Sequence, residues 1–425
     1  MEYKIKVVTK NILRAALFMV VAVSIPSTAS VFVRMQTDLG GIDIELFDEA
    51  SGEAVNPVET VENFLFYVNG GLDGNGYDGT FIHRRAKLDD AGVSVLQMGG
   101  DTFNPADGTF TSNEGISHIP VSNLVVNNEP GISNAIGTLA MARSAGNVNS
   151  AGAEFYINLV DNIVLDTIDE GFTVFGKVLG DGMEVLDKIG ALERCKDIGF
   201  NLPFPCSDFP QVPLVAIEAD NGAIFTTPVE QSNLVNLLNI GLDTDDDGVI
   251  DRVEDAAPID GDFNNDAVID SLQANVVSFR TISGDYISLL TPQDINFRST
   301  DVLGETFAYT TIDRFDPNQG LAGLAILQGF FATQITGALV NNSATVTLTL
   351  PDGESPNAFF SFGPTLDNAV PHWHEFNFDG ETGAQITGNI INLHYVDGGR
   401  GDADLQLDGS IKTYPGGPVL SLIHI

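Results

Sequence analysis

Short segments that alternate apolar and polar residues dominate the chain from residue 31 to about residue 220. Residues 33–37 and 41–47 show this alternation, which is the pattern of a strand with one buried face. Two stretches break the period and predict helices, one after Pro57 and one near Asp181. Their apolar faces carry Val61, Phe64, Leu65 and Val68 in the first helix, and Met183, Leu186 and Ile189 in the second. Many short strands with two helices predict a closed antiparallel sheet with helical caps over residues 31–220.

The pattern changes in residues 221–275 and again in residues 276–419. The first range opens with a short apolar segment that predicts a helix (Leu234, Val235, Leu237, Leu238), and an Asp-dense connector follows over 243–270. In the second range, four apolar or alternating segments are separated by turns rich in Gly, Pro and Asp, which favours a β-sandwich. These segments cover residues 286–290, 344–350, 359–362 and 390–395.

The first thirty residues have the pattern of a targeting segment. Lys4, Lys6, Lys10 and Arg14 precede an apolar run over 15–25, and small residues follow it. This order is typical of a signal peptide, and the run is shorter than the roughly 20 residues that span a bilayer. We therefore expect an exported protein, periplasmic, cell-surface or secreted, with no transmembrane span in the mature chain. An uncleaved membrane anchor is the alternative.

Charge narrows the partners further. The 425 residues include 19 Lys and Arg against 58 Asp and Glu, a formal net charge of −39. Such a surface repels phosphate backbones and anionic lipids, so we expect no nucleic-acid partner, whereas calcium suits it. Cys195 and Cys206 lack the spacing of a metal site, and export favours a disulfide between them over two free thiols.

The Asp-dense connector contains two loops with calcium-binding spacing. The first fits D-x-[DN]-x-[DN]-G-x5-E without a mismatch, and Gly248 allows its sharp turn. Its expected oxygen ligands are Asp243, Asp245, Asp247, the Val249 carbonyl, Asp251 and Glu254. The second loop offers Asp262, Asn264, Asp266 and Asp270, but has Ala267 in place of the glycine and Gln273 as a neutral last ligand.

The paired loops resemble the Asp-rich calcium repeats of thrombospondin type 3 and dockerin-like modules. The resemblance implies structural Ca²⁺ that stiffens the connector by binding its ordered form only. A solvated acidic linker is the alternative for the first loop, and whether the second, weaker loop is an independent site stays open.

Three groups of segments carry the chemistry of the first domain. They are Gly76–Arg84 with its His-Arg pair, Val95–Asp101 with its Gly-Gly-Asp end, and the set formed by 137–143, 153–158 and 172–178. In this order they resemble the cyclophilins, peptidyl-prolyl cis-trans isomerases, over about residues 32–190. The resemblance implies a mainly β fold: an eight-stranded antiparallel barrel with two capping helices, here followed by the calcium-loop connector and the C-terminal β-sandwich.

The reaction of this family explains the residue types. Rotation about an X-Pro bond breaks no covalent bond, so it needs no nucleophile and no cofactor. It needs an apolar pocket for the proline ring of the polypeptide substrate and a donor near the prolyl nitrogen. Arg84 matches the catalytic arginine, whereas His83 is expected to be a structural neighbour. The remaining substrate-binding positions implied by the resemblance are Val95, Leu96, Gln97, Met98, Ala142, Phe155, Tyr156, Leu165 and Phe172.

Some residues depart from the family pattern. Met98 stands where glutamine usually precedes Gly-Gly, and Gln97 lies one position earlier. Because neighbouring strand residues face opposite sides, Gln97 should face away unless the inserted segment 87–92 produces a bulge. Glu154, Tyr156, Val164 and Phe172 also differ from the commonest residues. We therefore expect reduced or altered activity, with a non-enzymatic protein that binds Pro-containing segments as the alternative.

The third region resembles the bacterial choice-of-anchor U domain. The similarity lies in 265–276, 350–353, 372–376, 397–404 and 415–418. Residues 420–425 resemble a translated sequencing adaptor, and we expect them to be an artefact. His372 and His374 suggest a metal pair without a third partner, so a structural role is favoured. The tripeptide Arg400–Asp402 lies in a Gly/Asp turn, and chance explains its similarity to an adhesion motif.

Overall fold

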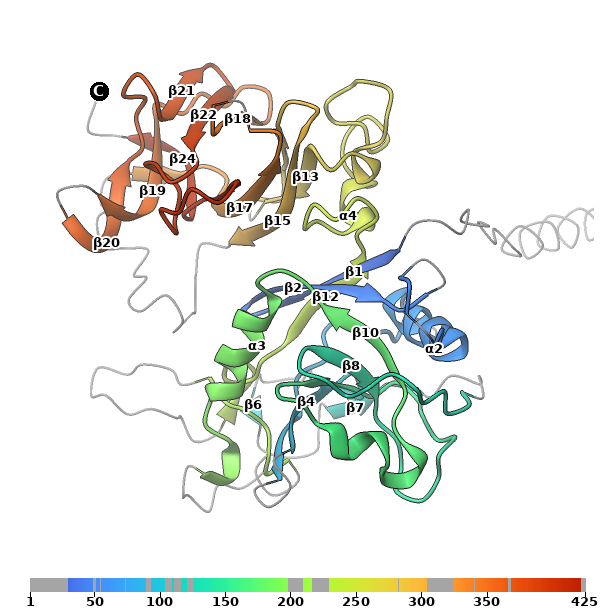
Figure 1. Cartoon of the computed structure of the whole chain (residues 1–425). Coiled ribbons are helices and arrows are strands. Elements are labelled where there is room, and N and C mark those ends of the chain that lie inside the picture. Colours follow the sequence, from blue (N-terminus) through green and yellow to red (C-terminus); the bar gives the residue numbers. More distant parts are fainter. Residues whose placement is uncertain are drawn as a thin grey trace, which may run out of the picture.

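The computed structural model describes residues 30–421, except for 49–50, 54, 73, 89–92, 104–108, 111–115, 121–125, 198–208, 216–228, 282, 304–323, 340 and 366–367. The signal-peptide prediction therefore lies outside the described residues, apart from Ser30. A blue and green barrel and an orange and red β domain are joined by the yellow Asp-rich segment (Figure 1). No helix within the described ranges has the length and apolar character needed to cross a membrane.

The N-terminal domain is built on one eight-stranded antiparallel sheet. In spatial order its strands are β12 (Leu237–Leu242), β1 (Val31–Thr37), β2 (Gly40–Leu46), β10 (Val174–Val178), β8 (Thr138–Met141), β9 (Phe155–Asn158), β4 (Val93–Met98) and β3 (Arg84–Leu88). Backbone hydrogen bonds join the two edges: Leu237 donates to Thr80 (2.7 Å) and Ile82 donates to Val235 (2.9 Å). This is the predicted barrel, and its inward residues form one apolar core.

Both predicted capping helices are confirmed. Helix α2 (Val58–Val68) follows Pro57, and its Phe64 ring lies 5.0–5.3 Å from the rings of Tyr77, Phe155 and Phe175. Helix α3 (Gly182–Ala191) buries Leu186 and Ile189 against the same core, as its spacing predicted. Burial of these faces stabilises the helices more than their length alone could.

The helix predicted at Leu234–Leu238 is wrong. These residues enter β12, the strand that pairs with β1 and completes the sheet. A short apolar run can form either a strand or a buried helix, and the free edge of β1 decided the outcome because it offers a ladder of backbone partners. The barrel therefore extends to Leu242, and Asp243 continues it by donating its N–H to the Phe32 carbonyl (3.2 Å).

Between α3 and β12 the chain builds a small second core on the outside of the barrel. Its buried members include Phe81, Cys195, Val212 and Leu214. The elements between α3 and β12 are η3 (Cys195–Asp197), β11 (Val229–Glu230) and η4 (Gln231–Asn233). The other short elements of this domain precede α3: β5 (Asp101–Phe103), β6 (Thr109–Phe110), β7 (Ile116–His118), η1 (Ile163–Asp166) and η2 (Ile168–Glu170). Cys195 is disulfide-bonded. Its predicted partner, Cys206, lies outside the described residues.

The C-terminal domain consists of two antiparallel sheets that share one apolar core. The first has the order β13 (Val276–Arg280), β14 (Tyr286–Leu290), β18 (Ser343–Thr349), β22 (Ile390–Val396) and β21 (Gly383–Thr387). The second has the order β15 (Ile295–Leu303), β17 (Phe330–Gly337), β24 (Gly416–Ser421), β19 (Ala358–Thr365) and β20 (Asn368–Glu375), with β16 (Leu324–Ile326) and β23 (Ser410–Lys412) at its side. The four strands predicted from the sequence are all present.

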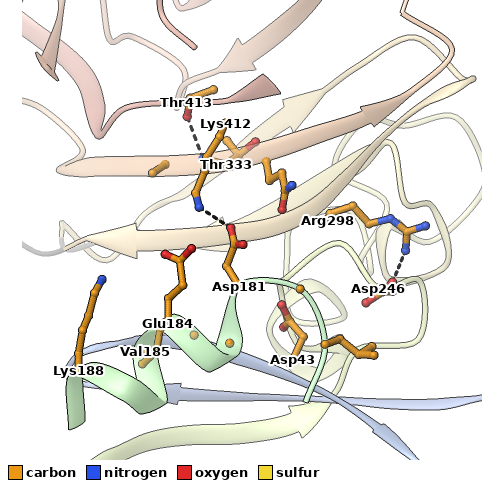
Figure 2. A pocket seen from close by; sticks show the side chains of 16 residues that line it. Asp43, Asp181, Glu184, Val185, Lys188, Asp246, Arg298, Thr333, Lys412 and Thr413 are labelled. Atoms are coloured by element: carbon orange, nitrogen blue, oxygen red, sulfur yellow. Dashed lines mark hydrogen bonds and ion pairs between the residues drawn. The ribbon is translucent and has the colours of Figure 1, made fainter. Parts of the chain in front are cut away.

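Charged side chains join the two domains. Arg34 of β1 is buried, donates to Asp43 (2.6 Å), and reaches the Thr300 carbonyl of β15 (3.2 Å). A neighbouring cavity of about 420 Å³ lies between α3 and the C-terminal sheet, and Figure 2 shows the side chains that line it. Ion pairs cross it from Lys412 to Asp181 and from Arg298 to Asp246. The Asp-rich segment therefore contacts the C-terminal domain through Asp246 and the barrel through the Asp243 N–H.

Candidate active site and candidate metal centre

Arg84 begins β3, at the edge of the barrel sheet, and its side chain is exposed. Two amide oxygens hold its guanidinium. Its Nη1 donates to Gln97 Oε1 (2.9 Å), and its Nε donates to Gln211 Oε1 (2.8 Å). Nη2 has no hydrogen-bond partner within the described part of the chain, so its N–H groups are available to a ligand.

Gln97 lies beside Arg84 without any bulge. The two residues are direct cross-strand partners in a continuous β3–β4 register, and such partners share one face. Met98 is fully buried in the barrel core, so the expectation that Gln97 faces away is wrong. Lys87 and Leu88 of the inserted segment only lengthen the hairpin beyond the site, while residues 89–92 lie outside the described residues.

The predicted pocket residues divide between two faces of the barrel wall. Five of them gather in one apolar cluster on the outer face: Val95, Ala142, Tyr156, Leu165 and Phe172. Leu96, Met98 and Phe155 instead belong to the main core and are completely buried, so their assignment as substrate contacts is corrected. The reason is the two-residue period of β4 and β9, which sends alternate side chains inward.

Hydrogen bonds and ring contacts fix the outer cluster. The Tyr156 hydroxyl donates to Asn134 Oδ1 (2.8 Å), and burial raises the pKa of Tyr156 well above its usual range. Its ring meets Phe172 edge-on at 6.0 Å. Arg143 covers the other ring with its Cζ 4.3 Å from the Phe172 centroid, and Arg143 Nη2 donates to the Gly171 carbonyl (2.7 Å). Ala142, Leu165 and Phe172 stay partly exposed.

A polar chain runs behind Arg84. Gln97 Nε2 donates to Glu154, and Glu154 lies 3.6 Å from Nε2 of the buried His83. The His83 contact, with the Gln97 hydrogen bond, outweighs burial and lowers the pKa of Glu154. His83 Nδ1 in turn lies 3.9 Å from Asp101. His83 is therefore inside the wall and supports Glu154, as expected for a structural neighbour.

A cavity of about 340 Å³ lies next to these groups. The residues of its wall include Gln97, Ala142, Arg143, Ser144, Ser150 and Glu154. The backbone at Ala142 pairs with the segment that carries Glu154, because the Ala142 N–H donates to the Glu154 carbonyl (2.9 Å). The site thus combines a fixed cation, a half-exposed apolar cluster and a polar groove.

The first Asp loop brings its carboxylates together. One oxygen from each of Asp243, Asp245 and Asp247 lies within 4.8 Å of the others. Glu254, in the short helix α4 (Asp251–Glu254), is also fully buried. Asp247 Oδ2 and Glu254 Oε2 have no hydrogen-bond partner among the described residues. Burial raises the pKa of both carboxyl groups, and the neighbouring charges of Asp243 and Asp245 raise both further. A bound cation would relieve this repulsion.

The other expected ligands of this loop have different surroundings. Asp251 accepts hydrogen bonds from the N–H and hydroxyl groups of Thr244. Val249 donates its N–H to Asp247 Oδ1 (2.8 Å). Gly248 adopts φ +96°, as the sharp turn requires.

The second loop has the same backbone pattern but a different interior. Asp262 accepts the N–H groups of Asp266 and Ala267, as Asp243 does in the first loop. However, the Gln273 amide donates to Asp266 Oδ1 (3.3 Å) and to the Val268 carbonyl (3.1 Å). Asn264 also donates to Asp266, and Asp270 accepts from Ser278 beyond the loop, next to the 3-10 turn η5 (Asp270–Leu272). Within the described ranges, only the first loop forms a three-carboxylate cluster.

Two C-terminal motifs have structural surroundings. The rings of His372 and His374 lie 5.6 Å apart on β20, without a third metal-ligating residue grouped with them in the described chain. Asp402 is completely buried and accepts N–H groups from Gly398 and Lys412, so the Arg400–Asp402 tripeptide does not present its carboxylate to a partner.

Sequence reasoning missed Gln211, Asn134 and Arg143. Gln211 follows a segment without strand or helix period, and only the folded chain brings it to Arg84. Asn134 and Arg143 act through loop geometry on Tyr156 and Phe172. Of the three, only Arg143 had a signal, since it ends the 137–143 segment next to Ala142.

Comparison with known proteins covers the N-terminal part. Residues 32–201 match the family model described as cyclophilin type peptidyl-prolyl cis-trans isomerase/CLD. A peptidyl-prolyl cis-trans isomerase of Acinetobacter baylyi is 36% identical over 169 residues, 39% of this chain and 76% of that protein. Peptidyl-prolyl cis-trans isomerase B of Escherichia coli is 35% identical over 162 residues, 37% of this chain and 82% of that protein.

Solved structures give weaker similarity. A cyclophilin type isomerase from Cryptosporidium parvum aligns with 19% identity and a TM-score of 0.30, covering 50% of this chain and 97% of that chain. The same protein crystallised with the dipeptide Ala-Pro aligns with 18% identity and a TM-score of 0.28, covering 50% and 98%. The resemblance of the Asp loops and of the C-terminal domain to known modules stays a prediction.

Proposed function

This chain belongs to the cyclophilin-type peptidyl-prolyl cis-trans isomerases, and from that premise we propose that Arg84 catalyses X-Pro rotation in extracytoplasmic polypeptides. The observation that carries the proposal is the fixed guanidinium of Arg84, whose Nη2 edge is free of partners among the described residues. The outer apolar cluster provides the wall for a proline ring.

The chemistry requires one well-placed donor. The X-Pro amide resists rotation by about 18–20 kcal/mol because its C–N bond has double-bond character. As the bond twists, the prolyl nitrogen recovers its lone pair and becomes a hydrogen-bond acceptor. A donor from Arg84 Nη2 is therefore stronger in the twisted state than in the ground state, which is the condition for catalysis.

The other groups position the substrate and transfer no proton. Tyr156 keeps its hydroxyl neutral and bound to Asn134, so its ring acts as an apolar surface. The cavity beside Ala142 and Glu154 offers room for residues that precede the proline. His83 is buried, and its Nε2 lies 3.6 Å from Glu154. The reaction then depends on geometry and charge alone.

Exchange spectroscopy on a prolyl peptide tests this role. Arg84→Ala should lower kcat/KM by about 100-fold, the usual effect of losing one transition-state donor. Arg280→Ala is the matched control, because Arg280 is exposed, lies in the C-terminal domain, and donates its Nε to the nearby Gly284 carbonyl. Equal rates for Arg84→Ala and wild type would remove Arg84 from the mechanism. Peptide binding without turnover in the wild type would favour the Pro-binding alternative.

A second proposal concerns calcium: the first Asp loop holds one structural Ca²⁺. The buried, partnerless oxygens of Asp247 and Glu254 support it, since such carboxylates are costly without a cation. In the second loop, the Gln273 amide already donates to Asp266, an expected ligand, and to the Val268 carbonyl, whose place in the loop matches that of Val249 in the first. We therefore assign the ion to the first loop only.

The position of this loop gives the ion a structural task. Arg252 of α4 donates to the Ile240 carbonyl and pairs with Asp78 of the barrel, both at 2.7 Å. Glu254 of the same helix accepts the Ser278 N–H of β13 (3.1 Å). An ion bound between Asp247 and Glu254 would therefore hold the barrel and the C-terminal domain in one arrangement.

Calorimetric titration with CaCl₂ tests the assignment on the full chain after a chelator has removed bound metal. One binding site is expected, and Asp247→Asn should abolish it. Asp266→Asn, the equivalent change in the second loop, should leave the site intact. Two sites in the wild type, or a melting temperature that chelator leaves unchanged, would contradict the proposal.

Export is the third part of the proposal. It rests on the basic, apolar and small-residue order of residues 1–30, and a cell-surface location would follow from the choice-of-anchor resemblance. Cell fractionation followed by N-terminal sequencing of the mature protein checks it. A mature chain that still begins with Met1 in the cytoplasm would refute it.

A further inference from the structure

We propose that Gln211 is a positioning residue for Arg84, so that the segment 209–215 is part of the isomerase site. This segment lies beyond residue 201, where the match to the isomerase family ends. The inference rests on the proposed catalytic role of Arg84. It assigns a function in catalysis to the small core that the chain builds between α3 and β12.

The geometry gives Gln211 half of the restraint on the guanidinium. A guanidinium is a planar group with five N–H donors, and its orientation is set by the acceptors around its edge. Gln97, on β4, accepts a hydrogen bond from Nη1. Gln211 accepts one from Nε, the guanidinium nitrogen nearest the backbone. With only one acceptor, the exposed arginine could still rotate about its side-chain bonds. With both, the plane is fixed and Nη2 points to a single place.

The orientation of the first acceptor is itself determined. Gln97 Nε2 donates to Glu154, so its amide oxygen faces Arg84. Glu154, Gln97 and Arg84 thus form one chain of hydrogen bonds, and Gln211 closes it from the opposite side.

Gln211 can act this way because its backbone is attached to the strand that carries Arg84. The Arg85 N–H donates to the Gln211 carbonyl (2.7 Å), so the segment continues the ladder at the β3 edge. Val212 accepts the Cys195 N–H (3.0 Å), and Val212 is completely buried. Phe209 packs against Phe81 with ring centroids 5.8 Å apart. The side chain at 211 therefore starts from a well-anchored position.

Three variants separate the hydrogen bond from packing. Gln211→Met keeps the length of the side chain but removes the acceptor, and should lower kcat/KM about tenfold, the effect of one charge-assisted hydrogen bond. Gln211→Glu keeps an acceptor oxygen and should recover most of the rate. Gln231→Met is the matched control, because Gln231 also lies between α3 and β12, and its amide donates to the Phe103 carbonyl instead of contacting Arg84.

A double-mutant cycle identifies the route of the effect. In an Arg84→Ala background, Gln211→Met should cause no further loss, because the group that it positions is absent. Exchange spectroscopy gives all rates, and melting temperatures confirm that each variant is folded.

The outcomes distinguish the two proposals. If Arg84→Ala retains the wild-type rate, the proposed mechanism fails regardless of Gln211. If Arg84→Ala is impaired but Gln211→Met is not, only the positioning role fails. A Gln211→Met loss that persists in the Arg84→Ala background, or that Gln211→Glu does not recover, would also overturn the positioning role.

Discussion

Substitutions at positions 97 and 98 test which face of β4 each of these two side chains occupies. Cyclophilin resemblance places glutamine at position 98, but the structure puts Met98 in the core and Gln97 beside Arg84. Met98→Gln should therefore destabilise the barrel without improving catalysis, whereas Gln97→Met should reduce catalysis with little effect on stability.

The magnitude follows from burial. Met98 is 0% exposed, so its replacement loses about 2 kcal/mol of apolar burial. Burying the new amide costs about 1–3 kcal/mol more, because an apolar core offers it no hydrogen-bond partner. The sum, roughly 3–5 kcal/mol, corresponds to a melting temperature lower by about 10 °C for a domain of this size. Gln97→Met removes the hydrogen bond to Arg84 and should lower kcat/KM about tenfold.

The assay must report on the barrel itself. The single tryptophan of the chain, Trp373, lies in β20 of the C-terminal domain, so its fluorescence follows the other domain. Hydrogen exchange of the β4 and β9 amides during urea unfolding is the suitable measurement, with exchange spectroscopy for the rate. A Met98→Gln protein of wild-type stability and higher rate would refute this placement of β4.

Three further predictions concern Glu154, Arg34 and Gly41, which lies next to Arg34. The pKa of Glu154 is lowered below its ordinary value of 4.5, chiefly by the His83 contact, so its stabilising effect is complete above pH 4.5 and is lost as the pH falls further. Melting temperatures from pH 7 to pH 3 should show this loss in the wild type and a smaller loss in Glu154→Gln; identical profiles would contradict it. Arg34→Ala removes a buried cation that serves Asp43 and the Thr300 carbonyl, and should cost about 3–5 kcal/mol in urea unfolding. Gly41→Ala should act in the same direction, because its Cβ would lie 2.1 Å from Arg34 Nη2, and a stable Gly41→Ala protein would show that the Arg34 contact is dispensable.

Local patterns in the sequence were sufficient for most of the fold. The alternation in β1 and β2 and the helical spacing of α2 and α3 appear in the structure because each element buries its own apolar face. The Asp243–Asp247 cluster could also be predicted, since five consecutive residues and one glycine produce it without help from distant parts of the chain. The motifs around Arg84 indicated the reaction for a similar reason, because each motif of the family is a continuous segment of sequence.

Other features depended on contacts between residues far apart in sequence. Leu237–Leu242 became a strand because the edge of β1 was open, and an apolar run carries no sign of that. Gln97 and Met98 exchanged their expected roles because the β3–β4 register, set by pairing across the hairpin, decides which face each one takes. Gln211 contacts Arg84 although the two residues lie 127 positions apart in the sequence. Gln273, at the last ligand position of the second loop, donates its amide to Asp266 of the same loop. Periodicity describes one element at a time, whereas hydrogen-bond partners are chosen only when the elements pack together.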